Sequence, residues 1–238
     1  MINNKKILAI IPARGGSKGL PDKNIKLLLD KPLIAWTIEQ AKNSKFIDEI
    51  HVSTDSPKIA KIAENYGIKV PDLRPDYLAT DSSSTIDVVE YIIKKYEEQN
   101  KFFDYIVLLE PTSPLRKKND IDNAIDKLNV NPKAHGVVSV GKVSLEHPSI
   151  VKKINENNFV DSYIKSSIKI SQRQQLDEAY FPYGVIYLIK TKYFKKYKSF
   201  YTKKIIPFLI ERWQNYEIDD IFDFICIENI LKFNINKL

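Results

Sequence analysis

The chain has 238 residues, of which 43% are apolar, and this length and composition are enough to bury the core of one large domain. Its formal net charge is +7, but the 37 basic residues are scattered without a dense block, which argues against a nucleic-acid or membrane partner. One cysteine rules out an internal disulfide, and no apolar stretch reaches the roughly 18 residues of a membrane span, so we expect a cytoplasmic protein.

Short β-like runs alternate with amphipathic helical patterns along the chain. This alternation predicts the α/β class, with a mainly parallel sheet covered by helices on both faces. The expected strands are Lys6 to Ile11, Glu49 to Ser53, Tyr105 to Leu109, Gly136 to Val140 and Gly184 to Ile189. The expected helices are Pro32 to Asn43, Ser56 to Tyr66, Ser84 to Glu98, Asn119 to Leu128 and Asp219 to Phe233.

A glycine-rich loop follows the first expected strand. Three of the chain's seven glycines fall within five residues there, and glycine lets backbone N–H groups approach a ligand because it has no Cβ and tolerates positive φ. Arg14, Lys18 and Lys23 add positive charge, so the loop predicts a polyanionic ligand, with a nucleoside triphosphate as the first candidate. Its spacing matches neither the Walker A nor the G-x-G-x-x-G pattern. An ordinary strand-to-helix turn is the alternative interpretation.

The segment from Leu73 to Thr85 precedes the third expected helix. Its serines and threonines can cap that helix or contact a ligand, and the two roles are compatible because a helix N-terminus with free N–H groups binds anions. The next segment, Leu108 to Arg116, contains two prolines that stiffen a turn after a strand. Such a turn can present Glu110 and Arg116 to a site, or it can be a stiff loop with solvated charges.

The interval from Val143 to Phe181 interrupts the alternation. It is polar, and its pattern suggests a lid, a hairpin or a dimerisation arm. The chain shows no internal repeat and no low-complexity linker. We therefore expect one domain over residues 1–238, with residues 143–181 as a dimerisation or lid insertion.

Two carboxylates near the last expected helix form a candidate metal site. If the segment is extended, Glu217 and Asp219 lie on one face and suit a hard cation such as Mg²⁺ against phosphate oxygens. The spacing alone favours the alternative, in which Asp219 or Asp220 caps the helix and Asp223 is an acid of its first turn. The three histidines show no metal-ligand spacing, and His51 is expected to be packed within a strand.

Taken together, these segments resemble the acylneuraminate cytidylyltransferase family, which includes CMP-sialic acid synthetases and CMP-legionaminic acid synthetase-like members. The resemblance runs from Ile7 to about Asp223. Its motifs are Ile11 to Gly19 with Lys23-Asn24, Ser53 to Ser56, Arg74-Pro75 with Leu78 to Asp81, Pro111 to Arg116, Arg173 to Leu176, Gly184 with Tyr187, and Ile218 to Asp220.

The resemblance implies a three-layer, Rossmann-like nucleotidyltransferase fold and the transfer of CMP from CTP to a nine-carbon 2-keto-3-deoxy sugar acid, with Mg²⁺ and a homodimer. Catalytic roles fall on Arg14, Lys23 and Asp219. CTP contacts are expected from Ala13, Arg14, Gly15, Ser17, Lys23, Asn24, Arg74, Ala79, Thr80 and Thr85. Sugar contacts are expected from Glu110, Arg173, Gln174 and Tyr187, and metal ligands from Glu217 and Asp219.

The chain departs from the family pattern at three places. Many sialic acid enzymes carry Gln where this chain has Glu110, Arg-Pro-Asn-Gly where it has Phe181 to Gly184, and Asp where it has Glu217. The first two places are expected near the sugar, so legionaminic acid or another diamino relative is as plausible as N-acetylneuraminic acid. A CMP-sugar synthetase for pseudaminic acid or an eight-carbon acid such as KDO is the alternative. A basic, non-catalytic nucleotide- or RNA-binding protein is the alternative from another class, and it would leave Glu217 and Asp219 without a role.

Overall fold

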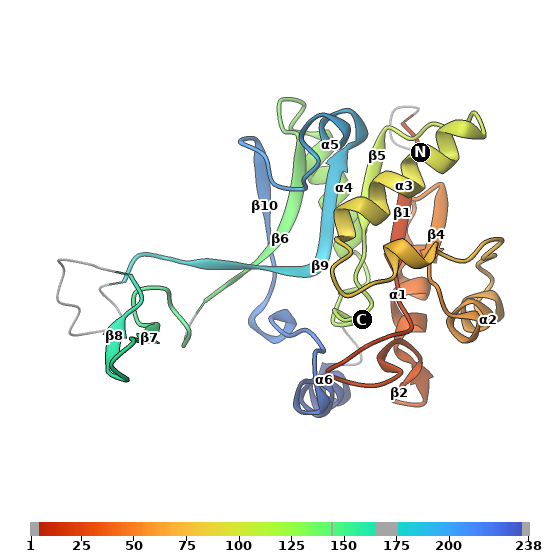
Figure 1. Ribbon diagram of the computed structural model, residues 1–238. Helices are drawn as coiled ribbons and strands as arrows, with labels where there is room; N and C mark the ends of the chain where they lie inside the picture. The colour runs from red at the N-terminus through yellow and green to blue at the C-terminus, as the bar shows by residue number, and fades with distance from the viewer. Residues whose placement is uncertain (1–4, 144, 165–175, 235–238) are drawn as a thin grey trace.

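The computed structural model describes residues 5–143, 145–164 and 176–234 of the chain (Figure 1). In that part of the chain, six strands form one sheet in the order β10-β6-β9-β5-β1-β4. The strands are β1 (Ile7–Pro12), β4 (Glu49–Ser53), β5 (Tyr105–Leu108), β6 (Gly136–Lys142), β9 (Tyr180–Lys190) and β10 (Ile205–Leu209). β1 is parallel to β4 and β5, and β10 is parallel to β6, whereas β9 is antiparallel to both of its neighbours. The expected mostly parallel sheet is confirmed.

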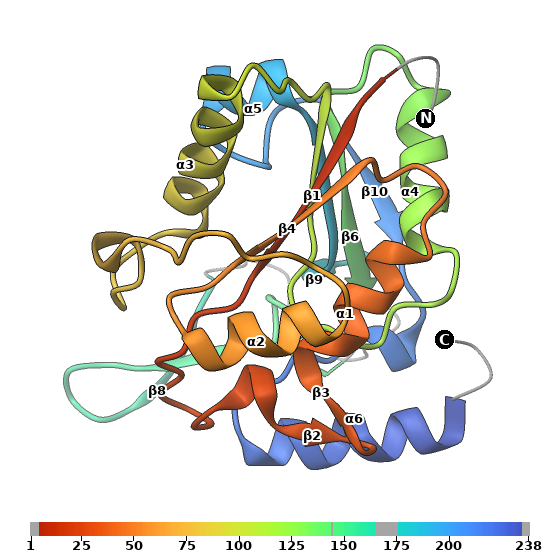
Figure 2. The ribbon, with the colours of Figure 1, turned by 90° about the vertical axis from the view of Figure 1, so that its right-hand side faces the viewer.

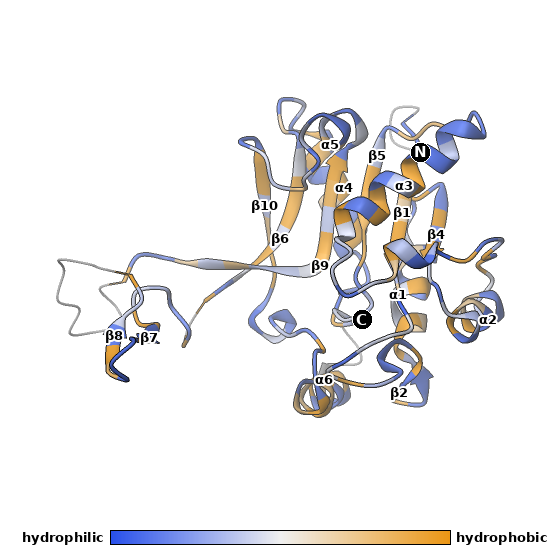
Figure 3. Cartoon of the chain, in the orientation of Figure 1, coloured by the Kyte–Doolittle hydropathy of each residue, from blue (hydrophilic) through white to orange (hydrophobic). Residues whose placement is uncertain are grey.

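Helices cover both faces of this sheet, as Figure 2 shows for α3 on one side and α4 on the other. The helices are α1 (Leu33–Lys42), α2 (Pro57–Asn65), α3 (Thr85–Glu98), α4 (Asp120–Asn129), α5 (Thr191–Tyr197) and α6 (Ile221–Asn234). The odd-numbered residues of β1, from Ile7 to Ile11, pack with α1, α2 and α4, whereas Leu8 and Ile10 pack with α3 and α5. A central parallel strand that is buried on both faces has a continuous run of apolar residues in its sequence. Figure 3 shows that the strands of the sheet are largely hydrophobic.

All ten predicted helices and strands are present, most with ends within about two residues of those expected. The sequence pattern did not predict α5, β10 or the two-stranded hairpin β2 (Leu27–Leu28)–β3 (Lys31–Pro32). The second hairpin, β7 (Lys152–Ile154)–β8 (Val160–Ser162), falls in the interval for which a hairpin was one of three alternatives. β10 is an edge strand that contains Pro207, and a proline inside an apolar run argues against a strand unless that strand lies at an edge. α6 packs against α1 in a third apolar cluster that includes Trp36 and Ile227.

The described residues between β6 and β9 form an arm that leaves the body of the molecule (Figure 1). The two strands stay paired out to Lys142 and Tyr180, and the arm carries the β7–β8 hairpin. Its described apolar side chains include Ile154, Phe159 and Val160, each about 70% exposed. The expectation of a hairpin is confirmed, whereas a role as a lid or a dimerisation arm stays a prediction. Among the described helices, none combines the length and the apolar character needed to cross a bilayer.

Candidate functional site

A cavity of about 440 Å³ lies where the segments that follow β1 and β5 meet the segments that precede α3 and α6. Parallel strands place their carboxyl ends at one edge of a sheet, which is where ligands bind in open α/β folds. The glycine loop, the segment before α3, the turn after β5 and the segment before α6 all contribute to its wall. The charged residues of the wall are Arg14, Lys18, Lys23, Arg74, Asp81, Glu110 and Asp219. The four segments singled out in the sequence thus meet at one cavity.

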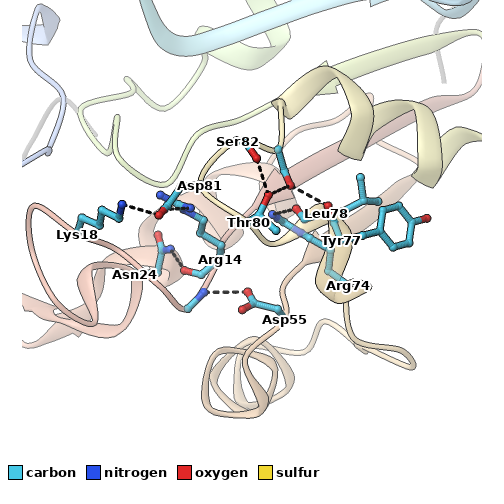
Figure 4. A network of polar contacts seen from close by, with 12 residues as sticks. Arg14, Lys18, Asn24, Asp55, Arg74, Tyr77, Leu78, Thr80, Asp81 and Ser82 are labelled. Carbon is cyan, nitrogen blue, oxygen red and sulfur yellow. Dashed lines mark hydrogen bonds and ion pairs between the residues drawn. The ribbon is translucent and has the colours of Figure 1, made fainter.

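The backbone of the glycine loop is anchored on both sides. The N–H of Gly15 donates to Oδ1 of Asp55 at 2.9 Å, and Nδ2 of Asn24 donates to the carbonyl of Arg14 at 3.0 Å (Figure 4). A Cβ on Gly19 would lie 2.4 Å from the carbonyl oxygen of Asp219. Among the described glycines only Gly67 has a positive φ. This loop therefore needs glycine for close approach to the segment before α6, and the positive φ that the sequence suggested is not used.

The cations of the loop face the cavity. Nη1 of Arg14 lies 2.7 Å from Oδ1 of Asp81, and Nζ of Lys18 lies 2.6 Å from Oδ2 of the same carboxylate. Nζ of Lys23 donates to the carbonyl of Ile218 at 2.6 Å and lies 3.3 Å from Oδ1 of Asp219, and its side chain is only 12% exposed. The burial and the carbonyl contact fix Lys23 in position, whereas Arg14 and Lys18 share one exposed counter-charge.

The segment before α3 places polar groups on the other wall (Figure 4). Nε and Nη2 of the buried Arg74 donate to Oγ and the carbonyl of Ser53, and burial lowers the pKa of its guanidinium. Ser84 caps α3, because its Oγ accepts from the N–H of Asp87 at 3.1 Å, and Thr85 at the first position of that helix lines the cavity. The capping role and the position beside the cavity are both present.

The predicted nucleotide contacts differ in where the structure places them. Seven of them line the cavity: Arg14, Ser17, Lys23, Asn24, Arg74, Thr80 and Thr85. Ala13 is buried in the core, where its N–H donates to the carbonyl of Ser53. The N–H of Ala79 donates to the carbonyl of Asp76 at the end of a short 3₁₀ turn. Neither these two residues nor Gly15 is among those that line the cavity in the described structure.

The carboxylates of Glu110 and Glu217 form a cluster between the end of β5 and the middle of β9. Burial raises the pKa of Glu110 to about 7, with Glu217 as a second cause. Oε1 of Glu217 accepts from Oγ of Ser113 at 2.9 Å and from the N–H of Gly184, and a Cβ on Gly184 would lie 2.4 Å from Oε2 of Glu110. Burial, together with Glu110, raises the pKa of Tyr187. The structure thus brings Glu110 and Tyr187 together, whereas the other predicted sugar contacts, Arg173 and Gln174, lie outside the described residues.

In the segment before α6, different residues cap the helix and form the candidate metal site. Oδ1 of Asp220 accepts from the N–H groups of Phe222 and Asp223, so Asp220 caps the helix. Oδ2 of Asp223 accepts from the N–H of Asp219 at 2.9 Å. The carboxylate of Asp219 takes no part in the cap and is 87% exposed. The cap that the spacing favoured is therefore confirmed, with Asp220 as the cap and Asp223 in the first turn, whereas Asp219 as the cap is contradicted.

The carboxylates of Glu217 and Asp219 fit Mg²⁺ if substrate phosphates supply the further ligands. Asp219 lines both the main cavity and an adjacent one of about 550 Å³, whereas Glu217 lines only the adjacent one. In the described ranges no three His, Cys, Asp or Glu residues form a metal-ligating group. Mg²⁺ is commonly held by one or two carboxylates together with substrate phosphates and water, so two acids beside a phosphate-sized cavity suffice.

His51 is packed within strand β4, as the sequence predicted. Burial lowers its pKa to about 4, and its Nδ1 lies 3.3 Å from the hydroxyl of Tyr96.

Arg116 corrects one expectation from the sequence. Its side chain is 0% exposed and is presented neither to the cavity nor to solvent. Its guanidinium donates to the carbonyls of Glu110, Gly184 and Val185 and to side-chain oxygens of Thr37 and Gln40. The planar guanidinium thus binds groups of the protein itself, three backbone carbonyls and two side-chain oxygens, rather than a ligand. Asp81, in contrast, was not indicated as a functional residue by the sequence, and its role emerges only from its contacts with Arg14 and Lys18.

Comparisons with known proteins place this geometry in context. Residues 8–233 match the cytidylyltransferase family. The chain is 40% identical over 231 residues to the CMP-N,N'-diacetyllegionaminic acid synthase of Legionella pneumophila, covering 96% of this chain and 97% of that protein. It is 33% identical over 219 residues to an N-acylneuraminate cytidylyltransferase of Escherichia coli, covering 92% of this chain but only 50% of that protein. The solved structure of CMP:2-keto-3-deoxy-manno-octonic acid synthetase complexed with CTP matches the fold with a TM-score of 0.68 at 19% identity, covering 98% of this chain and 100% of that chain.

Proposed function

The chain belongs to the cytidylyltransferase family, and from that premise we propose that it transfers CMP from CTP to the anomeric hydroxyl of a nine-carbon 2-keto-3-deoxy sugar acid and releases pyrophosphate. One observation carries the proposal: the cations of the glycine loop and the carboxylate of Asp219 face one cavity. Family membership makes the chain a nucleotidyltransferase. We therefore set aside the alternative of a non-catalytic nucleotide- or RNA-binding protein.

The arrangement supports a specific division of roles. Negative charge develops on the leaving pyrophosphate, and fixed positive groups stabilise it without having to reorganise. Lys23 is held by the carbonyl of Ile218, and Arg14 is anchored through its backbone, so both cations can act in this way. Asp219, with Glu217 beside it, would hold Mg²⁺, which supplies additional positive charge to the phosphate oxygens when bound. Arg74 and Thr85 border the wall on which the cytidine would lie.

The sugar acid is expected beside Glu110. This carboxylate lines the cavity next to the turn of prolines, and after burial it is the second cause that raises the pKa of Tyr187. The relative with 40% identity acts, by its name, on N,N'-diacetyllegionaminic acid, which makes that sugar type the first to test. N-acetylneuraminic acid is the second, and pseudaminic acid and KDO are the alternatives.

A pyrophosphate-release assay tests the proposal. Purified protein with CTP and Mg²⁺ is expected to release pyrophosphate when legionaminic or N-acetylneuraminic acid is added, and to lose this activity when the metal is chelated. The control reactions omit the sugar acid or replace CTP with UTP. Release that stays at the no-sugar level with every acid of the panel, including pseudaminic acid and KDO, contradicts the proposed reaction.

We also propose that the protein is a cytoplasmic homodimer that pairs through the β6–β9 arm, with neither nucleic acid nor membrane as a partner. Exposed apolar side chains such as Phe159 and Val160 support the pairing through the arm, because contact with a second copy would remove this apolar surface from water. Light scattering after size-exclusion chromatography is expected to give the mass of a dimer, and Phe159→Glu is expected to shift it toward the monomer. A monomer at all working concentrations would refute the pairing.

A further inference from the structure

The carboxylate of Asp81 lies between two of the cations at the cavity (Figure 4). Its Oδ1 accepts a hydrogen bond from Nη1 of Arg14 at 2.7 Å, and its Oδ2 lies 2.6 Å from Nζ of Lys18. The contact with Lys18, followed by that with Arg14, holds the pKa of Asp81 below its ordinary value. One acidic side chain therefore pairs with two of the positive groups that face the phosphate site and offsets part of their charge.

The segment that carries Asp81 is held by bonds that do not involve its carboxylate. Oγ of Ser83 donates to the carbonyl of Tyr77 at 2.9 Å, and it lies 2.7 Å from Oγ1 of Thr80. These contacts fix the turn between the 3₁₀ segment Asp76–Leu78 and α3. Asp81 can consequently release Arg14 without breaking the hydrogen bonds that shape its own turn.

The glycine loop is anchored in the same independent way. Asn24 holds the carbonyl of Arg14, and Asp55 holds the N–H of Gly15, so the backbone does not depend on Asp81. The three charged side chains are all partly or fully accessible, at 34% for Arg14, 49% for Asp81 and 78% for Lys18. An anion that enters the cavity can therefore exchange with this carboxylate while both backbones stay in place.

We propose that Asp81 is the internal counter-anion of the phosphate site, and that its carboxylate competes with the phosphates of CTP and of pyrophosphate for Arg14 and Lys18. The inference rests on the proposed function. Each phosphate contact to these cations replaces an existing ion pair, so part of the binding free energy of both ligands is offset. When pyrophosphate leaves, the carboxylate returns to the cations and stabilises the free site. Asp81 is thus a positioning residue that sets affinity and takes no part in bond making.

Direct binding of inorganic pyrophosphate tests this competition. Asp81→Asn keeps the shape of the side chain and removes its charge, and calorimetric titration of the full chain in Mg²⁺ is expected to show pyrophosphate bound about five- to tenfold more tightly. The same variant is expected to lower KM for CTP without raising kcat, a split that a purely structural role would not produce. Asp81→Glu restores the carboxylate and is expected to bind pyrophosphate nearly as the unchanged protein does.

Asp72 offers a matched control. Its carboxylate lies 2.6 Å from Nζ of Lys95, at the same distance as in the Asp81–Lys18 pair, but neither Asp72 nor Lys95 is among the residues that line the phosphate cavity. Asp72→Asn is therefore expected to leave pyrophosphate affinity unchanged. Equal or weaker pyrophosphate binding by Asp81→Asn overturns the inference. If the unchanged protein turns over CTP, that result leaves the proposed function standing, whereas a chain that binds neither CTP nor pyrophosphate overturns both.

Discussion

Replacing Asp219 with alanine is expected to lower kcat by about a hundredfold or more, which corresponds to about 3 kcal/mol of lost transition-state stabilisation. The carboxylate is 87% exposed, faces the cavity and is free of the helix cap, so its proposed task is to hold Mg²⁺ against the phosphates. Its ion pair with Lys23 is long at 3.3 Å, and Lys23 keeps its bond to the carbonyl of Ile218. The free energy of unfolding is therefore expected to change little. Steady-state kinetics at several Mg²⁺ concentrations, combined with urea unfolding, measure both quantities.

The neighbouring Asp220 provides the control for this experiment. Its side chain caps α6 through the N–H groups of Phe222 and Asp223, and its removal is expected to cost about 1 kcal/mol of stability with little change in kcat. The two adjacent aspartates are thus expected to show opposite profiles. An Asp219→Ala protein that keeps full Mg²⁺-dependent turnover would remove the proposed metal role.

The central sheet could be predicted because the apolar runs in the sequence match the burial of the strands in the folded protein. β1 is a continuous apolar run, and its two faces are both covered by helices, so burial imposes the composition that identified it. The positions of the glycine loop and of the turn after β5 follow from the same rule, since the carboxyl ends of parallel strands converge. The meeting of these segments at one cavity was therefore predictable from their order along the chain.

The contacts of individual charged side chains could not be predicted in this way. Asp81 lies in a segment that the sequence singled out, but its pairing with Arg14 and Lys18 joins residues more than 60 positions apart. Likewise, the spacing of Asp219 and Asp220 allowed either residue to cap α6, and only the hydrogen bonds of the folded chain distinguish them. Long-range pairing depends on where loops meet, and no periodicity in the sequence encodes it.

β9 shows a third limit of the sequence pattern. It was expected from Gly184 onward, but it begins at Tyr180 and runs antiparallel to both neighbours. Its pairing with β6 shifts register between Val138 and Val140, and Oγ of Ser139 donates to the carbonyls of Tyr183 and Ile186 across this irregularity. Local propensity does not predict such a bulge, because its polar groups are satisfied by side chains distant in sequence.

Replacing Arg116 with methionine is expected to lower the free energy of unfolding by about 3–5 kcal/mol, the largest stability effect that we predict. Methionine fills much of the volume but donates nothing, so it leaves the buried carbonyls of Glu110, Gly184 and Val185 without the guanidinium. Burial lowers the pKa of Arg116 to about 10, which still leaves it charged at neutral pH. Through these carbonyls the guanidinium joins the turn after β5 to the middle of β9, beside the proposed sugar site.

Urea unfolding of matched variants measures this effect. Arg212→Met is the control, because Arg212 is exposed and its guanidinium lies over the ring of Tyr216 at 5.3 Å, a contact whose loss is expected to cost about 1 kcal/mol or less. Arg116→Lys keeps a charge but supplies three donors on a flexible stem in place of a planar fork, so it is expected to fall between the unchanged protein and Arg116→Met. Equal unfolding midpoints for Arg116→Met and Arg212→Met would show that the hydrogen bonds of Arg116 do not stabilise the contacts among α1, β9 and the turn after β5. A loss of stability confined to the Arg116 variants, and graded by the number of donors that remain, would show that they do.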